Sequence, residues 1–257
     1  MKTIIANWKM HLGIRESLAQ ARGVLRFIMG NEILPEIVLC PSFTALSEVR
    51  KVLVRTRVAL GGQTTGTERF GAFTGDISVA QLDDVGCTFV IIGHSERRAM
   101  NGETDDVVNA KMKLVAQTSI VPVLCVGESV PDRESGMAES TVAAQLVMAL
   151  RNVEFARSSR LLVAYEPVWA IGSGKSARIS DVVAMHGIIR KTLEELLKNM
   201  HVDVQILYGG SVSGENAYQF LREPEIDGVL VGGASLKIQE FEAIIFAARD
   251  VMIAQNV

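Results

Sequence analysis

The stretch Phe89-Val90-Ile91-Ile92-Gly93-His94-Ser95-Glu96-Arg97 joins a run of apolar residues directly to a run of polar ones. Its first four residues are apolar without alternation, which is typical of a strand buried on both faces in a parallel sheet. The residues after Gly93 are typical of a loop and the start of a helix. The stretch therefore predicts a parallel strand with polar groups at its carboxyl end.

Seven more apolar runs of strand length occur along the 257 residues. The eight predicted strands are Thr3 to Ala6, Ile37 to Cys40, Val58 to Leu60, Phe89 to Ile92, Val121 to Val126, Leu161 to Tyr165, Val204 to Tyr208 and Gly228 to Val231. The segments between them have helical spacing. One predicted helix follows an N-cap at Ser180 and has the apolar face Val182, Met185, Ile189, Leu193 and Leu196; another has the face Phe241, Ile244, Ala248 and Met252.

Alternation of strands with helices predicts βαβ units. A doubly wound open sheet is the alternative, but it normally carries a Gly-x-Gly-x-x-Gly turn after its first strand, and this sequence has no such turn. No low-complexity tract, charge block or linker divides the chain. We therefore predict an α/β fold with a single domain over residues 1–257, a (β/α)8 barrel of eight parallel strands inside an outer ring of helices.

Charge and composition exclude several function classes. A net charge of −3 gives no overall attraction to nucleic acid or to an anionic membrane, and no apolar run is long enough to span a bilayer. The first residues are interrupted by polar side chains too early for a signal peptide. Three unclustered cysteines favour a reducing compartment, so we expect a cytoplasmic protein. The four histidines lack a paired spacing and no nucleotide motif is found, so we expect neither a metal nor a cofactor.

Polar side chains follow three of the predicted strands at their carboxyl ends. Asn7 and Lys9 follow the first strand, His94 the fourth and Glu166 the sixth. In a parallel barrel these ends meet on one face, which is where reactive residues lie. A carboxylate, an imidazole and an ammonium group together can move a proton next to a carbonyl.

Small residues follow the last three strands. They are Gly172, Ser211, Gly232 and Gly233, and a second Gly-Gly pair precedes Ser211. Barrels commonly bind phosphate at these loops through backbone N–H groups, and glycine permits close backbone approach. The two pairs together predict a phosphorylated substrate.

Six segments carry a resemblance to the triosephosphate isomerase family: Ala6 to Met10, Gly71 to Gly75, Gly93 to Arg97, Ala164 to Gly172, Tyr208 to Ser211 and Val231 to Ser235. They occur in the family's order at the matching strand ends, and the resemblance covers essentially the whole chain. It implies a TIM barrel that interconverts dihydroxyacetone phosphate and D-glyceraldehyde 3-phosphate without a cofactor, in glycolysis and gluconeogenesis.

The resemblance also implies a role for each polar residue. Glu166 would be the base that moves a proton between two substrate carbons through an enediol or enediolate. His94, at the start of a helix, would polarise the carbonyl as a neutral acid, because a helix N-terminus disfavours the imidazolium. Lys9 would stabilise negative charge, and Asn7 would donate a hydrogen bond to the substrate and position Lys9.

Other residues would support the site. Glu96 resembles the family's buried carboxylate near the site, and Ser95 would contribute a backbone or hydroxyl hydrogen bond. The segment from Pro167 to Ala177 resembles a lid that excludes water. The remaining polar candidates, His186, His201 and Cys125, are expected to be structural.

The loop from Gln63 to Asp76 resembles the one that inserts into a partner subunit, which implies a homodimer. His11, Thr64 and Asp76 replace the Asn, Asn and Glu that are usual in the family, and they cluster at that interface. Away from the interface, Leu207 in the seventh strand and Ser173 in the lid replace the Gln and Thr that are common in the family. The contacts and strength of the dimer are therefore left open.

Two alternatives share this sequence pattern. An isomerase of a four-carbon sugar phosphate would use the same base and phosphate contacts, and the depth of the pocket would decide between them. A non-catalytic barrel that binds a sugar phosphate need not retain both Glu166 and His94, so their joint presence disfavours it.

Overall fold

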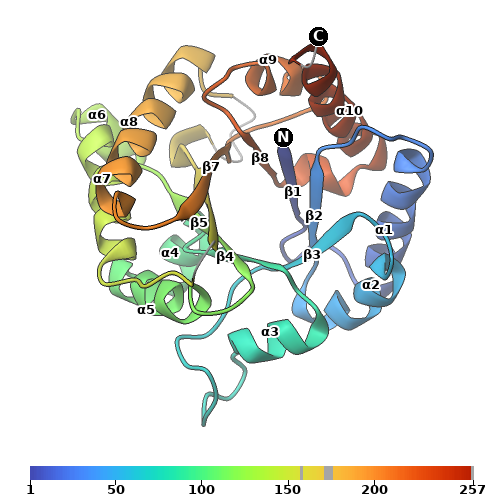
Figure 1. Cartoon of the computed structure of the whole chain (residues 1–257), viewed down its shortest axis with the longest axis horizontal. Helices are drawn as coiled ribbons and strands as arrows, with labels where there is room; N and C mark the ends of the chain where they lie inside the picture. The colour runs from blue at the N-terminus through green and yellow to red at the C-terminus, as the bar shows by residue number, and fades with distance from the viewer. Residues whose placement is uncertain (157–158, 171–175, 256–257) are drawn as a thin grey trace.

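Within residues 1–156, 159–170 and 176–255, which the computed structural model describes, eight parallel strands close into a barrel in chain order. Figure 1 shows the strands in the centre and the helices around them, which confirms the predicted (β/α)8 barrel. The strands are β1 (Thr3–Asn7), β2 (Glu36–Cys40), β3 (Val58–Gly62), β4 (Phe89–Ile92), β5 (Val121–Val126), β6 (Ser159–Tyr165), β7 (Val202–Tyr208) and β8 (Gly228–Val231). Pairing of β1 with β8, with Thr3 opposite Gly228, completes the ring.

The helices lie outside the ring in the order expected of βαβ units. They are α1 (Ile14–Ile28), α2 (Leu46–Leu53), α3 (Val79–Val85), α4 (Ser95–Asn101), α5 (Asp105–Val115), α6 (Val130–Glu134), α7 (Ala138–Leu150), α8 (Ile179–Leu197), α9 (Ala217–Leu221) and α10 (Ile238–Gln255), with short 3₁₀ helices η1 (Phe43–Ala45), η2 (Val168–Ala170) and η3 (Gly233–Leu236). No helix in the described part of the chain is both long and apolar enough to cross a bilayer.

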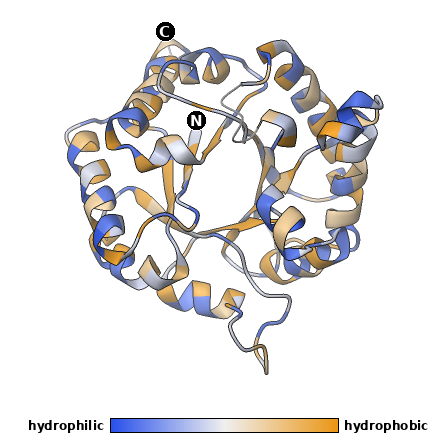
Figure 2. Ribbon diagram, turned by 180° about the vertical axis from the view of Figure 1, so that it is seen from behind, coloured by the Kyte–Doolittle hydropathy of each residue, from blue (hydrophilic) through white to orange (hydrophobic). Residues whose placement is uncertain are grey.

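Apolar residues on both faces of the strands build two cores. In Figure 2 the strands of the ring are largely coloured as hydrophobic. One core lies between strands and helices, and a smaller one fills the barrel with Ile5, Val38, Cys40, Phe89, Ile91, Val123, Cys125, Leu162, Ala164, Leu207 and Leu230. This arrangement explains why the strands lack polar alternation, because neither face meets water.

Strands β6 and β7 begin two residues earlier than predicted. The added first two residues include Arg160 in β6 and Asp203 in β7, which interrupt the apolar pattern. β3 is longer than predicted because Gly61 and Gly62 continue it. A Cβ at position 61 would lie 2.5 Å from Sγ of Cys40, so glycine here permits close approach of neighbouring strands and does not mark a turn.

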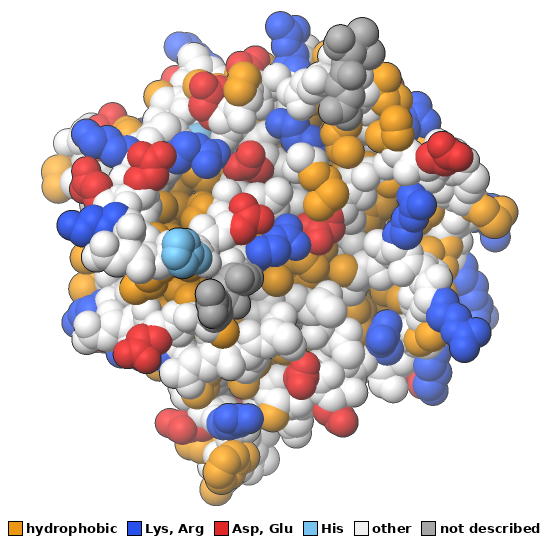
Figure 3. Space-filling view, in the orientation of Figure 1, with side chains coloured by type: hydrophobic (Ala, Val, Ile, Leu, Met, Phe, Trp, Pro, Cys, Tyr) orange, Lys and Arg blue, Asp and Glu red, His pale blue; other side chains and the backbone are white. Residues whose placement is uncertain are grey.

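A polar network crosses the amino-terminal mouth of the barrel. The guanidinium of Arg160 donates from Nη1 to Oε1 of Glu36 (3.0 Å) and from Nη2 to Oε2 (2.8 Å), and also bonds Gln205. Thr3 donates to Glu36 at 3.1 Å. In Figure 3, acidic and basic side chains gather near the middle of this face. The network links β1, β2, β6 and β7, so its polar residues belong to strands and not to loops.

The predicted N-cap of α8 is wrong by two residues. Its first hydrogen bonds run from the backbone N–H groups of Asp181 and Val182 to the carbonyl of Arg178, so Ser180 lies inside the first turn. Arg178 is the N-cap, with extended backbone angles. Most of the predicted apolar face is buried, although Leu197 is buried in α8 where Leu196 was expected.

The buried side chain of His186 on α8 makes folding stability depend on pH. Burial lowers its pKa from 6.5 to about 4, and its Nδ1 lies 3.1 Å from the carbonyl oxygen of Glu225. The unfolded chain takes up this proton first as pH falls, so stability present above pH 6.5 is lost on acidification to about pH 4. The expected loss in the free energy of unfolding from this residue is about 3 kcal/mol.

Urea denaturation between pH 7.5 and 4.5 would measure this effect. His186→Gln keeps a donor for Glu225 but has no proton to gain, so the variant should lose less stability than the wild type over this range. Equal losses in the two proteins would contradict the assignment.

Candidate active site

A pocket of about 380 Å³ opens where the strands end. Its lining residues are Asn7, Lys9, His11, His94, Glu166, Gly209, Gly210, Ser211, Val212, Leu230, Gly232, Gly233 and Ala234. The structure thus brings together the predicted catalytic residues and the predicted phosphate-binding residues that follow β7 and β8. The remaining predicted phosphate contact, Gly172, lies outside the described residues.

Glu166 lies directly after β6 with its carboxylate almost fully buried. Oε1 is 3.0 Å from Nε2 of His94, and Oε2 accepts a hydrogen bond from the backbone N–H of Ser95 at 2.8 Å. The backbone N–H of Glu166 donates to the carbonyl of Val126 on β5 at 2.7 Å. Both the backbone and the carboxylate of Glu166 are therefore fixed. Ser95 acts through its backbone, which was one of the two contributions expected of it.

Two glycines leave room for Glu166. A Cβ at Gly127 would lie 1.7 Å from the carbonyl oxygen of Glu166, and one at Gly209 would lie 2.9 Å from its Cγ. Real Cβ atoms do not approach backbone oxygen so closely, so position 127 in particular requires glycine.

His94 is the N-cap of α4. Its Nδ1 accepts a hydrogen bond from the backbone N–H of Glu96 at 3.2 Å, so this nitrogen carries no proton. The proton of the neutral ring is then on Nε2, which faces Glu166. His94 thus lies at a helix start, as the sequence predicted.

Lys9 adopts an unusual backbone conformation, with φ of 50°. Its backbone N–H donates to Oδ1 of Asn7 at 3.0 Å, and its carbonyl accepts from Nε2 of Gln63 at 2.7 Å. These bonds hold a left-handed conformation that costs a non-glycine residue about 1–3 kcal/mol. The side chain points its ammonium to Oε1 of Glu96 at 2.5 Å.

Glu96 is not the buried carboxylate that was expected, because 41% of its side chain is exposed in this structure. It lies in the first turn of α4 at the rim of the pocket, where water reaches it beside Lys9. Its contact with Lys9 nevertheless places it next to the predicted catalytic residues.

The buried carboxylate of this region is Glu128, which sequence reasoning missed. Its Oε1 accepts from the hydroxyl of Tyr165 (3.0 Å) and from Nε1 of Trp169 (2.7 Å). Burial, together with the Glu128 carboxylate, raises the pKa of Tyr165. The available signal was the Gly-Glu pair that follows β5, a strand end like those that carry the predicted site residues.

One part of the pocket wall is formed by Ser211, Gly232 and Gly233. A Cβ at Gly232 would lie 3.3 Å from Cε of Lys9, so the absence of a side chain keeps space beside the ammonium group. Gly233 begins η3. This part of the wall can accept an anionic group close to Lys9.

One of the residues expected to be structural, Cys125, lies near Glu166. Cys125 is buried inside the barrel, where burial and the nearby Glu166 raise the pKa of its thiol. Within the described ranges, no three His, Cys, Asp or Glu side chains come close enough together to hold a metal ion.

A family model described as triosephosphate isomerase matches residues 2–248. The chain belongs to the triosephosphate isomerase family. A Roseiflexus protein named triosephosphate isomerase is 44% identical over 243 residues, covering 94% of this chain and 95% of that protein. One from Aquifex aeolicus is 42% identical over 246 residues, covering 96% and 99%. A crystal structure of triosephosphate isomerase from Bartonella henselae aligns with a TM-score of 0.86 at 34% identity, covering 98% of this chain and 99% of that one.

Four of the five positions that were expected to depart from the family's usual residues are described. His11 lines the pocket and is exposed, and Asp76 is exposed on the long loop. Thr64 is buried and its Oγ1 accepts from Nζ of Lys111 at 3.0 Å. Leu207 packs inside the barrel. The fifth, Ser173, lies outside the described residues.

Replacement of Lys9 by Met should lower kcat/KM for the triosephosphate isomerase reaction about 100-fold, because it removes a positive charge that lines the pocket. Lys51→Met is the matched control, since Lys51 makes an ion pair of the same length with Glu48 on α2. Steady-state kinetics would compare the two. Equal activity of the Lys9 and Lys51 variants would exclude an electrostatic role for Lys9.

Proposed function

We propose that the chain interconverts dihydroxyacetone phosphate and D-glyceraldehyde 3-phosphate by proton transfer through an enediol or enediolate. The observation that carries the proposal is the buried carboxylate of Glu166 within 3.0 Å of Nε2 of His94, in a pocket also lined by Lys9. Membership of the triosephosphate isomerase family supports the same reaction.

In this mechanism Glu166 removes a proton from one substrate carbon and returns it to its neighbour. Nε2–H of His94 donates to the substrate carbonyl oxygen, which takes on negative charge as the carbon loses its proton. The ammonium of Lys9 stabilises this charge, and Asn7 positions Lys9 and donates to a substrate oxygen. The hydrogen bond from Ser95 to Glu166 orients the base before substrate arrives.

The substrate phosphate is held by Ser211, Gly232 and Gly233, and by the predicted contact at Gly172. These residues line the same pocket as Glu166, and Gly232 lies beside Lys9, so the phosphate would bind next to the ammonium group. No metal or cofactor enters the proposal.

A coupled assay with glyceraldehyde 3-phosphate tests the function, with a four-carbon aldose phosphate as competing substrate. Turnover of the three-carbon substrate in preference to the four-carbon one supports the proposal. Preference for the four-carbon substrate would assign the chain to that isomerase instead. Binding of phosphorylated sugar without turnover of either would indicate a binding protein.

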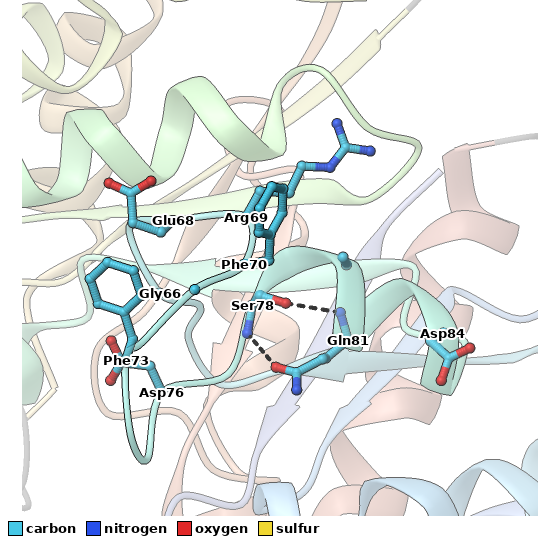
Figure 4. A pocket seen from close by; sticks show the side chains of 11 residues that line it. Gly66, Glu68, Arg69, Phe70, Phe73, Asp76, Ser78, Gln81 and Asp84 are labelled. Carbon is cyan, nitrogen blue, oxygen red and sulfur yellow. Dashed lines mark hydrogen bonds between the residues drawn. The ribbon is translucent and has the colours of Figure 1, made fainter.

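We further propose that two copies of the chain associate through residues 63–76. This loop projects beyond the ring of helices after β3 (Figure 1) and carries Phe70 and Phe73, whose exposures of 84% and 48% are high for apolar side chains. Figure 4 shows the two rings beside a hollow of about 440 Å³, near the start of α3 where Ser78 and Gln81 exchange hydrogen bonds.

Sedimentation equilibrium would test this association. A species of twice the 27.9 kDa chain mass is expected, and a species of the chain mass at micromolar concentration would contradict it. We also propose that residues 1–257 form one domain and that the enzyme works in the cytoplasm, where its three free, buried cysteines would stay reduced.

A further inference from the structure

The guanidinium of Arg133 on α6 contacts three groups from different segments of the chain. Nη1 lies 3.6 Å from Oε1 of Glu128, Nη2 donates to Oδ2 of Asp181 in the first turn of α8 at 2.6 Å, and Cζ lies 4.2 Å from the centre of the Trp169 ring. α6 has only five residues and none of them is buried. The contacts of Arg133 therefore hold other segments of the chain in place and contribute little to the packing of α6.

Trp169 is joined to Glu128 beneath this guanidinium. Its Nε1 donates to Oε1 of Glu128 at 2.7 Å. Glu128 is fully buried, and its second oxygen has no hydrogen-bond partner in the described part of the chain. A buried carboxylate is costly unless a cation pairs with it, and Arg133 supplies that positive charge. Arg133 thus stabilises the acceptor of Trp169 and covers the face of its ring.

The short segment that contains Trp169 also carries Glu166. The backbone N–H of Glu166 donates to the carbonyl of Val126 at 2.7 Å, and the N–H of Val168 donates to the carbonyl of Glu128 at 3.2 Å. The backbone from Glu166 to Trp169 is therefore fastened along residues 126–128. Arg133 contacts this segment through the Trp169 ring and connects it to α8 through Asp181.

We propose that Arg133 is a positioning residue for the isomerisation, which acts through Trp169 and Glu128 on the segment that carries Glu166. The inference rests on the proposed function. A lysine would not replace Arg133 fully, because only a planar guanidinium can stack on the indole while its edges meet two carboxylates.

Arg133→Met should lower kcat about ten-fold, since small displacements of a catalytic group cost rate, and should change KM less than about two-fold, since Arg133 does not line the pocket. Arg133→Lys should fall between this variant and the wild type. Arg249→Met on α10 is the matched control, because Arg249 lies 4.4 Å over the Phe246 ring and 2.9 Å from Asp250 and does not line the pocket. It should retain wild-type kcat and KM.

Two readouts separate positioning from a general loss of stability. In a Trp169→Ala background, Arg133→Met should cost less than in the wild type, because the contact through which it acts is already gone. Acrylamide should quench tryptophan fluorescence more strongly in Arg133→Met than in the wild type. Of the two tryptophans, Trp8 is fully buried, so the quenchable emission comes from Trp169.

The outcomes are distinct. Wild-type kcat in Arg133→Met, or the same fold-loss in the presence and absence of Trp169, would overturn the inference. A wild-type chain that isomerises no triose phosphate, although quenching of Trp169 responds to Arg133→Met, would overturn the proposed function instead.

Discussion

Glu166→Gln is expected to lower kcat about 10⁴-fold, at the upper end of what a single general base contributes, while KM changes little. Glutamine has the shape of glutamate and can still accept the hydrogen bond from Ser95, but it cannot take a proton from carbon. The substitution therefore removes the chemistry and keeps the pocket. The loss of kcat is measured by steady-state kinetics in the coupled assay.

Glu240→Gln is the matched control for this variant. Its carboxylate also accepts a backbone N–H, from Gly214 at 3.0 Å, but it lies on α10 and does not line the pocket. It should keep wild-type kcat. If Glu166→Gln retained more than about one hundredth of the activity, Glu166 would not be the base.

Gly127→Ala is expected to destabilise the fold by about 4 kcal/mol or more, because the new Cβ would meet the carbonyl oxygen of Glu166 at 1.7 Å and its carbonyl carbon at 2.6 Å. Gly127 and Glu166 follow the adjacent strands β5 and β6. Their backbones cannot move apart without breaking the hydrogen bond between Glu166 and Val126. Urea denaturation measures the change, and surviving folded protein should also lose activity as Glu166 shifts.

Gly187→Ala provides the contrasting control. Gly187 lies in α8 with open space around its Cα, so the same added methyl should stabilise the helix by about 0.5–1 kcal/mol. A loss of stability similar in both variants would mean that the close approach at Gly127 does not exist in solution.

The sequence was sufficient to place all eight strands because both of their faces are apolar. Phe89–Ile92, Val121–Val126 and Gly228–Val231 have the predicted bounds. The misplaced ends are polar or glycine-containing: Arg160 belongs to β6 because its guanidinium bonds Glu36 on β2 across the barrel mouth. The local sequence around Arg160 cannot predict a hydrogen-bond partner on a strand so distant in the chain.

The difference between local pattern and long-range contact also explains which site residues could be predicted. The residues at strand ends were predictable because a parallel barrel brings these ends together, and Asn7, Lys9, His94, Glu166 and Ser211 all line one pocket. Glu128 and Arg133 were not, because their importance comes from contacts with Trp169 that only the folded chain creates. The exposure of Glu96 was also mispredicted, since the turn in which a residue lies does not determine how much water reaches its side chain.

Closure of the ring by β1 and β8 has a consequence for biosynthesis. Thr3 leaves the ribosome long before its partner on one side, Gly228, is translated. Until then the nascent chain exposes a strand edge that can pair with other chains. Production of this protein should therefore be most vulnerable to aggregation during translation and least vulnerable once the final strand has emerged.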